Sequence, residues 1–327
     1  MGKIANRDIS VIIPARNAAD TLRETIDSVL NQDGLLEVVV VDDASEDATC
    51  SVCEAFRDQR LRVLRTSGVG IARALNLGFR EARGAFIARC DADDLYTAGR
   101  LKWQRALLSR RPDLVAVSSG YRTITETGNP VADLACEGEG RDVTSVLREG
   151  RAITSFCTWL MRAQALRACG GARPWFITGE DLDLQFRLAG QGSVWHEPAV
   201  GYAYRLHERS ITHMRSRAFN EFYETQARIF ARQRATGGID DLAKGRPPAV
   251  PDGIAGSGAR NAAARHVSDQ LHGQAWRLFD QRGLRHGLPA MLRAPAHAPA
   301  DMRKWRSLAV MMVKGILLRG GRTNAPR

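Results

Sequence analysis

The chain has 327 residues, of which 44% are hydrophobic and 25% are charged, as in an ordinary globular protein. This composition excludes collagen-like, disordered and coiled-coil chains, and no apolar run approaches the roughly 18 residues that a membrane-spanning helix needs. The formal net charge of +11 is carried by the last third, because residues 215–327 hold 20 Lys and Arg against 8 Asp and Glu, whereas residues 1–214 hold 27 against 28.

Strand-like and helix-like segments alternate over residues 8–120. The expected strands are short apolar runs rich in β-branched residues: Ile9–Ile13, Glu37–Val41, Leu61–Leu64 and Ala85–Ala88. The expected helices between them have apolar residues at helical spacing: Asp20–Leu30, Ala48–Phe56 and Ile71–Ala82. Strands that alternate with helices form right-handed βαβ units. The sequence therefore predicts an α/β protein with an open, mainly parallel, Rossmann-like sheet flanked by helices.

The rest of the chain is less regular. Its periodicity predicts two further strands, Leu114–Ser118 and Thr158–Met161, and four helices, Leu101–Leu108, Val143–Glu149, Asp181–Ala189 and Phe219–Phe230. Residues 237–260 are rich in Gly, Pro and Ala, which is typical of a linker. We therefore expect one domain over residues 1–236, a linker over 237–260 and a basic helical region over 261–327.

The six cysteines indicate a reducing compartment, because they are too sparse for a disulfide framework. Cys50 and Cys53 form a C-x-x-C pair, but no second Cys or His pair completes a zinc site. We interpret both as small buried apolar residues. The chain is expected to act in the cytoplasm, or as a peripheral protein at the cytoplasmic face of the membrane.

Polar residues follow three of the expected strands at the ends where ligands bind in an open parallel sheet. They are Pro14–Asn17, Asp42-Asp43 and Asp91-Ala-Asp93-Asp94. Two acidic clusters at one edge repel each other unless a cation or hydrogen-bond donors lie between them. An Asp-x-Asp pair suits a hard divalent cation, which takes its other ligands from water and substrate phosphates. The pattern points to a nucleoside diphosphate, although one Asp-Asp pair alone would indicate only a turn or a helix cap.

The segment from Gly68 to Arg73 is similar to a dinucleotide-binding loop but lacks its third glycine, which is replaced by Arg73. It also follows a strand that is not the first of the sheet. We interpret it as a loop that delivers the Arg73 guanidinium to phosphate oxygens.

Glu180, Asp181 and Asp183 fall in the first turn of an expected helix, where the helix dipole favours their charged forms. Helix capping explains one of these carboxylates but not three. A carboxylate held ionised in a cleft is a candidate general base for a hydroxyl group. His207 is a lone histidine, which is more often structural than a ligand.

In this order and spacing, the motifs resemble glycosyltransferase family 2, whose members are inverting enzymes with the GT-A fold. The resemblance extends from about Ile9 to Thr212. It rests on six segments: Val11–Asn17, Val41–Ser45, Gly70–Asn76, Ala88–Asp94, Glu180–Asp181 and Tyr204–His207.

The resemblance implies a nucleotide-sugar site built by the first three segments. Pro14, Ala15 and Asn17 would frame the base and ribose, and Asp43 would accept a hydrogen bond from the base. Arg73 would lie near the base or the diphosphate. Arginine stands where many relatives have an aromatic residue before the motif asparagine, which leaves the stacking of the base open.

The resemblance also implies a metal site and a general base. Asp91 and Asp93 would hold Mn²⁺ or Mg²⁺ on the donor diphosphate, with Asp91 also contacting the nucleotide-sugar, and His207 would complete the metal contacts. Glu180 would contact the nucleotide-sugar. Asp181 would be the general base that deprotonates the acceptor hydroxyl.

The implied reaction is the metal-dependent transfer of a sugar from a nucleotide-sugar, most often a UDP-sugar in this family, to a glycan or lipid-linked glycan in cell-surface polysaccharide synthesis. Two alternatives stay open: a nucleotidyltransferase, and a catalytically inactive GT-A binding module. A nucleotidyltransferase would bring a glycine-rich phosphate loop to the first strand, which Pro14–Asn17 is not. No nucleic-acid partner is expected, because no RNA-binding or helix-turn-helix motif accompanies the basic residues.

The basic C-terminal region contains one amphipathic segment. Its apolar residues recur at helical spacing: Met302, Trp305, Leu308, Ala309, Met312 and Ile316. Lys and Arg flank this stripe, so residues 302–322 predict a helix that lies on an anionic membrane. The alternatives are that the stripe packs on the first domain and that the region is a solvated basic tail.

Overall fold

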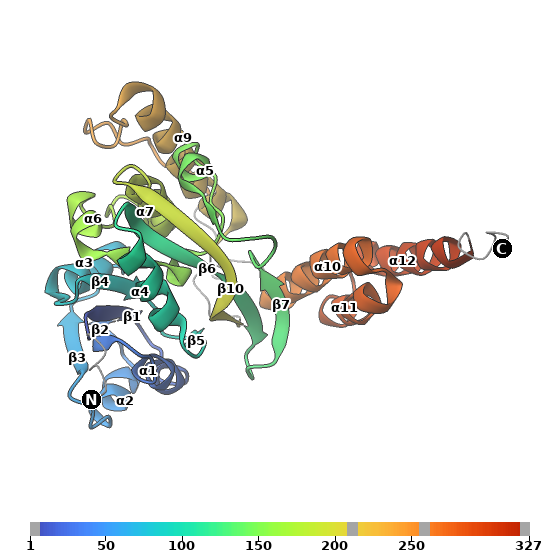
Figure 1. Ribbon diagram of the computed structural model, residues 1–327, viewed down its shortest axis with the longest axis horizontal. Coiled ribbons are helices and arrows are strands. Elements are labelled where there is room, and N and C mark those ends of the chain that lie inside the picture. The colour runs from blue at the N-terminus through green and yellow to red at the C-terminus, as the bar shows by residue number, and fades with distance from the viewer. Residues whose placement is uncertain (1–6, 208–214, 255–261, 321–327) are drawn as a thin grey trace. The chain divides into compact units, whose positions relative to one another are not determined.

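The structure is a computed structural model, and it describes residues 7–207, 215–254 and 262–320 (Figure 1). The chain divides into two compact units. The first consists of Met1–Arg122, Leu134–Tyr204 and Arg217–Ala255, and the second of Thr123–Asp133, Arg205–Ser216 and Gly256–Arg327.

The first unit begins with three βα repeats and a fourth strand, as the apolar periodicity predicts. In chain order these are β1 (Ile9–Ala15), α1 (Leu22–Leu30), β2 (Leu35–Asp43), α2 (Thr49–Glu54), β3 (Leu61–Thr66), α3 (Ile71–Glu81) and β4 (Phe86–Arg89). The four strands are parallel and lie in the order β3-β2-β1-β4.

The sheet continues beyond β4 with antiparallel pairs, so that the full order is β3-β2-β1-β4-β9-β6-β10-β5. The strands of this part are β5 (Leu95–Tyr96), β6 (Leu114–Thr125), β8 (Arg141–Asp142), β9 (Leu160–Arg162) and β10 (Ser193–Leu206). The helices are α4 (Arg100–Arg110), α5 (Thr144–Arg148), the 3₁₀ helix η1 (Phe156–Thr158), α6 (Ala163–Ala168), α7 (Glu180–Leu188) and α9 (Arg217–Gly237). The α/β class with helices on a central sheet is confirmed. The sheet is mixed: β1–β4 pair in parallel, whereas β9 pairs antiparallel with β4 and β6, and β10 with β5 and β8.

The long strand β10 is not among the expected elements. His196, Glu197 and Pro198 interrupt the first half of its sequence, and Gly201 lies in the apolar run that follows. β10 pairs with β5 and β8, and it brings residues near position 200 into the sheet beside β6.

Two apolar layers cover the faces of the sheet, because the side chains of each strand alternate between them. In β2, Val39 and Val41 belong to one layer, and Val38 and Val40 belong to the other. Gly78 of α3 lies directly on β1, where a Cβ atom would come within 2.3 Å of an Ile12 methyl group. The absence of a side chain there lets α3 approach the sheet closely.

The second unit contains β7 (Pro130–Leu134) in part, and the helices α10 (Ala262–Arg282), α11 (Leu284–His297) and α12 (Met302–Gly320). Its buried side chains include Leu271 of α10, Met291 of α11 and Met311 of α12. The helical character of the C-terminal region is confirmed, whereas the boundaries of the domains stay a prediction. In the described parts of the chain, no helix has the length and apolar character that crossing a membrane requires.

Candidate active site

The predicted site residues of the first unit gather at the carboxyl ends of β1, β2 and β4. Strand β1 lies between β2 and β4, so the chain order of the parallel strands reverses at this point. Loops that leave neighbouring strands in opposite directions open a crevice, which is where open α/β sheets bind ligands.

The loop after β1 is tied to the loop after β2 by Asn17. This residue adopts a left-handed backbone conformation with φ 53°. Its backbone N–H donates to Ser45 Oγ at 2.9 Å, and its side-chain Oδ1 accepts from the N–H of Glu46 at 2.8 Å. Pro14 and Ala15 are buried as the last residues of β1, so this turn presents backbone and the exposed side chains of Arg16 and Asn17.

Asp43 organises the loop between β3 and α3. Its carboxylate accepts hydrogen bonds from the Thr66 hydroxyl and from the backbone N–H groups of Val69 at 2.7 Å and Gly70 at 2.9 Å. Burial opposes the charged form, but these donors outweigh it and lower the pKa of Asp43. Arg73, in the first turn of α3, is exposed and forms no hydrogen bond or ion pair to any other described residue.

The Asp91–Asp94 loop is held by side chains from distant parts of the unit. One carboxylate oxygen of Asp91 accepts from Arg89 Nε at 2.7 Å, and the other accepts from the Cys157 thiol at 3.1 Å. The Tyr202 hydroxyl of β10 accepts from the Asp91 N–H at 3.1 Å and donates to the Asp94 carboxylate at 2.7 Å. Asp93 is half-buried.

Glu180 and Asp181 stand at the start of α7, which follows Gly179 in a left-handed conformation. Arg89 Nη1 donates to Glu180 Oε1 at 3.2 Å while Arg89 Nε binds Asp91. One buried guanidinium therefore joins the carboxylates after β4 to the carboxylates at the start of α7.

Burial raises the pKa of both Glu180 and Asp181 at the start of α7. Burial and the neighbouring charge of Asp181 raise the pKa of Glu180 to about 7, with Arg89 acting in the opposite direction. Burial is also the main cause that raises the pKa of Asp181, and Arg89 again opposes it. Asp181 is half-buried as a residue, and its carboxylate has a raised proton affinity.

Three residues of this site have no role in the sequence analysis. Arg89 is within the Ala88–Asp94 motif, and an arginine at the end of a buried strand, two residues before Asp91, is a signal in the sequence. Cys157 and Tyr202 lie 66 and 111 residues from Asp91, and no pattern in the sequence connects them with it.

The structure supplies two carboxylates, Asp91 and Asp93, for a cation. Over residues 7–207, 215–254 and 262–320, no group of three or more His, Cys, Asp or Glu side chains is arranged to hold a metal ion. His207, the third predicted ligand, belongs to the second unit and follows the end of β10.

Comparison with known proteins gives one family. The sequence model described as Glycosyl transferase family 2 matches residues 10–170. The putative glycosyltransferase EpsE of Bacillus subtilis is 32% identical over 193 residues, which are 56% of this chain and 67% of EpsE. The succinoglycan biosynthesis protein ExoO of Rhizobium meliloti is 43% identical over 99 residues, 29% of this chain and 28% of ExoO.

The fold is also found among solved structures. The crystal structure of S. aureus TarS 1-349 in complex with UDP-GlcNAc has a TM-score of 0.59 and 15% sequence identity, and the match covers 97% of this chain and 93% of that one.

Proposed function

Because the chain belongs to glycosyl transferase family 2 and is a glycosyltransferase, we propose that it is a metal-dependent inverting enzyme that transfers a sugar from a UDP-sugar to a hydroxyl group of a glycan or lipid-linked glycan. The observation that carries this proposal is Arg89, which joins Asp91 to Glu180 within one site. A donor diphosphate at the end of β4 would then lie beside the candidate base at the start of α7.

The donor would bind along the ends of β1, β2 and β4. Asp43 has a lowered pKa and is ionised at neutral pH. It can therefore accept a hydrogen bond from the nucleobase while it also holds the β3–α3 loop. Pro14, Ala15 and Asn17 would line the nucleobase and ribose, and the exposed Arg73 guanidinium would bind phosphate oxygens. The UDP-GlcNAc complex of TarS supports UDP as the nucleotide.

The residues present fit a divalent cation in their chemistry. Asp91 and Asp93 offer the carboxylate oxygens that Mg²⁺ and Mn²⁺ prefer, and such ions take most of their other ligands from water and phosphates. Both oxygens of Asp91 already accept hydrogen bonds, so we propose Asp93 as the main protein ligand of the cation, with Asp91 as the further ligand. When bound, the cation would neutralise charge on the departing nucleoside diphosphate.

Asp181 would take the proton from the acceptor hydroxyl. Its raised pKa makes it a stronger base than an ordinary aspartate, and a base whose pKa approaches the working pH is the more effective catalyst. The hydroxyl would attack the sugar from the face opposite the diphosphate, so one displacement inverts the anomeric centre. Glu180 would lie beside the donor sugar.

The proposed class of acceptor is inferred from the names of the relatives. ExoO is named for succinoglycan biosynthesis, and this supports a role in making a cell-surface polysaccharide. We place the enzyme in the cytoplasm, where nucleotide-sugars serve as donors, or at the cytoplasmic face of the membrane.

Nucleotide binding tests the donor site. We expect UDP to raise the melting temperature of the protein in the presence of Mn²⁺, because a ligand at a hundredfold excess over its Kd stabilises the folded state by about 2.7 kcal/mol. Asp93→Ala is expected to abolish the Mn²⁺-dependent part of this shift. Asp113→Ala, which removes an exposed carboxylate paired with Arg111, should leave it unchanged. A folded protein that no nucleoside diphosphate stabilises contradicts the proposal and favours a non-catalytic binding module.

We further propose that α12 contacts an anionic membrane surface. Its exposed apolar side chains include Met302, Trp305 and Val313, while Met311 and Gly315 face the interior of the second unit. Leu308, part of the predicted stripe, is half-buried, and the side chain of Ile316 lies outside the described residues. Exposed Arg303 and Arg306 on the same helix match the charge of anionic lipid.

Vesicle sedimentation tests this contact. At low salt the full chain should bind phosphatidylglycerol vesicles, and Trp305→Glu with Val313→Glu should reduce the bound fraction at least fivefold. Leu292→Glu makes the same change at an exposed apolar position of α11 and should have a smaller effect. Equal binding by the α12 variant and the wild type, or equal binding to neutral phosphatidylcholine, contradicts the proposal.

A further inference from the structure

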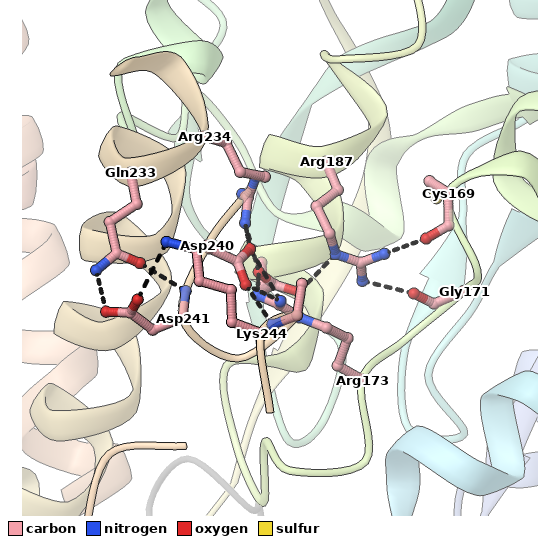
Figure 2. Close-up of polar contacts among 11 residues, drawn as sticks. Cys169, Gly171, Arg173, Arg187, Gln233, Arg234, Asp240, Asp241 and Lys244 are labelled. Atoms are coloured by element: carbon pink, nitrogen blue, oxygen red, sulfur yellow. Dashed lines mark hydrogen bonds and ion pairs between the residues drawn. The ribbon is translucent and has the colours of Figure 1, made fainter. Parts of the chain in front are cut away.

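Five charged side chains form a buried cluster around the first turn of α7. Two are aspartates that are almost fully buried, Asp183 of α7 and Asp240, which follows α9. The other three are Arg173, Arg187 and Arg234. Figure 2 shows four of them, Arg173, Arg187, Arg234 and Asp240, which converge from α7, α9 and two connecting segments. We call them the α7 ion cluster.

Within the cluster, Arg173 bridges the two aspartates. Its Nε and Nη2 groups donate to the Asp183 carboxylate, with 2.9 Å for Nε, and its Nη1 group donates to both oxygens of Asp240 at 2.8 and 2.9 Å. Arg234 Nη1 donates to Asp240 and lies 3.6 Å from Asp183. Asp183 is therefore held by Arg173, whose own position depends on Asp240.

Arg187 connects α7 to the rest of the unit at a second point. Its Nε group donates to Asp183 at 2.7 Å, one turn earlier on the same helix, and its terminal nitrogens donate to the carbonyl oxygens of Cys169 and Gly171 after α6. These bonds connect α7 to the preceding segment, whereas Asp240 connects it to the segment that follows α9.

The segment that carries Asp240 lies in the expected linker, residues 237–260, and is held by hydrogen bonds. The Asp240 carboxylate also accepts from the N–H of Ala243 at 2.9 Å, and the Asp241 N–H donates to Gln233 of α9 at 2.9 Å. Figure 2 shows Gln233, Asp241 and Lys244 together beside α9. The segment thereby presents Asp240 to the cluster from a fixed backbone.

The charges of the cluster make it sensitive to the loss of one member. Three guanidinium groups face two carboxylates, and Arg234 Nη2 has no hydrogen-bond partner among the described residues. Removing a carboxylate would leave a buried guanidinium without its counter-ion, which forces neighbouring groups to move. Asp183 is two residues from Asp181, so movement of this turn of α7 displaces the candidate base.

We propose that Asp240 is a positioning residue for sugar transfer: through Arg173 and Arg234 it fixes Asp183, and so sets where the Asp181 carboxylate lies. This inference rests on the proposed role of Asp181 as the base. A displacement of about 1 Å in a reacting group can cost up to about a hundredfold in rate. The bound nucleotide contacts a different part of the site, so its affinity should be independent of Asp240.

The test measures release of UDP from UDP-GlcNAc by the full chain with Mn²⁺, with water as the acceptor, beside the affinity for UDP. Asp240→Asn should lower kcat by about 10- to 100-fold and leave the Kd for UDP within about twofold. Asp240→Glu, which keeps the charge, should recover part of kcat. The matched control is Glu37→Gln, because Glu37 is also a buried carboxylate bound by an arginine, Arg62, and a backbone N–H, at the other end of β2.

The outcomes separate this inference from the proposed function. If the wild type releases no UDP, or Asp181→Asn releases it as fast as the wild type, the role of Asp181 fails and the inference fails with it. If release depends on Asp181 but Asp240→Asn keeps the wild-type kcat, only the inference is overturned. It is also overturned if Glu37→Gln loses as much kcat as Asp240→Asn, because both would then act through general destabilisation.

Discussion

Replacing Asp181 by asparagine is expected to lower kcat by about 10²- to 10⁴-fold, the range that a positioned general base contributes. The amide keeps the size of the side chain but cannot accept the proton of the acceptor hydroxyl. Affinity for UDP should change little, because the nucleotide is assigned to the ends of β1, β2 and β4. Initial rates of UDP release and nucleotide titrations on the same samples measure the two quantities.

The pH dependence of the wild type checks the same assignment. Activity requires the ionised base, so a raised pKa moves the loss of activity on acidification to a higher pH than an ordinary aspartate would give. Burial raises the pKa of Asp181, and that of Glu180 is raised to about 7, so kcat/KM should fall as the pH drops through this region, with an apparent pKa that belongs to the pair. Glu180→Gln removes the adjacent negative charge and should move the fall to lower pH. A fall centred near pH 4 in the wild type contradicts the assignment.

Arg89→Leu is expected to reduce the free energy of unfolding by about 3–5 kcal/mol at pH 8, the cost of removing one partner from a buried ion pair. Arg89 is buried and binds Asp91 and Glu180. Without it, these carboxylates and Asp181 face one another with no cation between them.

The loss should be smaller at pH 5.5 than at pH 8. Burial raises the pKa values of Glu180 and Asp181 in the folded state and Arg89 opposes this, so without Arg89 these two values rise further above those of the unfolded chain. The folded state then takes up protons as the pH falls, which stabilises it relative to the unfolded state. Urea unfolding at both pH values measures the difference. Arg65→Leu, which breaks an exposed pair with Glu54, should cost under about 1 kcal/mol at either pH. An equal loss for Arg89→Leu at both pH values would mean that Arg89 contributes by packing and not by charge.

The N-terminal part of the fold is predictable because its strands are short apolar runs. β1 to β4 and the helices between them appear in the sequence as alternating periodicities, each within a few residues of its observed bounds. The antiparallel part of the sheet is less predictable from the sequence. The stretch Gly138–Asp142 carries no apolar pattern, and β10 contains Glu197 and Pro198, so its position depends on pairing with β5 and β8 and not on local preference.

The candidate site is predictable where a motif is local. Asp91 with Asp93, and Glu180 with Asp181, are recognisable from spacing alone, and the structure joins Asp91 to Glu180 through Arg89. The contacts that hold these motifs are not local. Asp240 lies in a stretch whose Gly, Pro and Ala content predicts a linker, and its partner Arg173 is 67 residues earlier in the chain.

The contact between Tyr202 and the Asp91–Asp94 loop has a consequence for biosynthesis of the protein. During translation the ribosome delivers β1 to β4 long before β10, and the hydroxyl group that binds Asp94 follows it by 108 residues. A nascent chain can therefore form its parallel strands early while this loop still lacks its support. A product that terminates before β10 would retain the Asp-x-Asp motif without the Tyr202 hydroxyl that holds its loop, which makes it a poor competitor for the nucleotide.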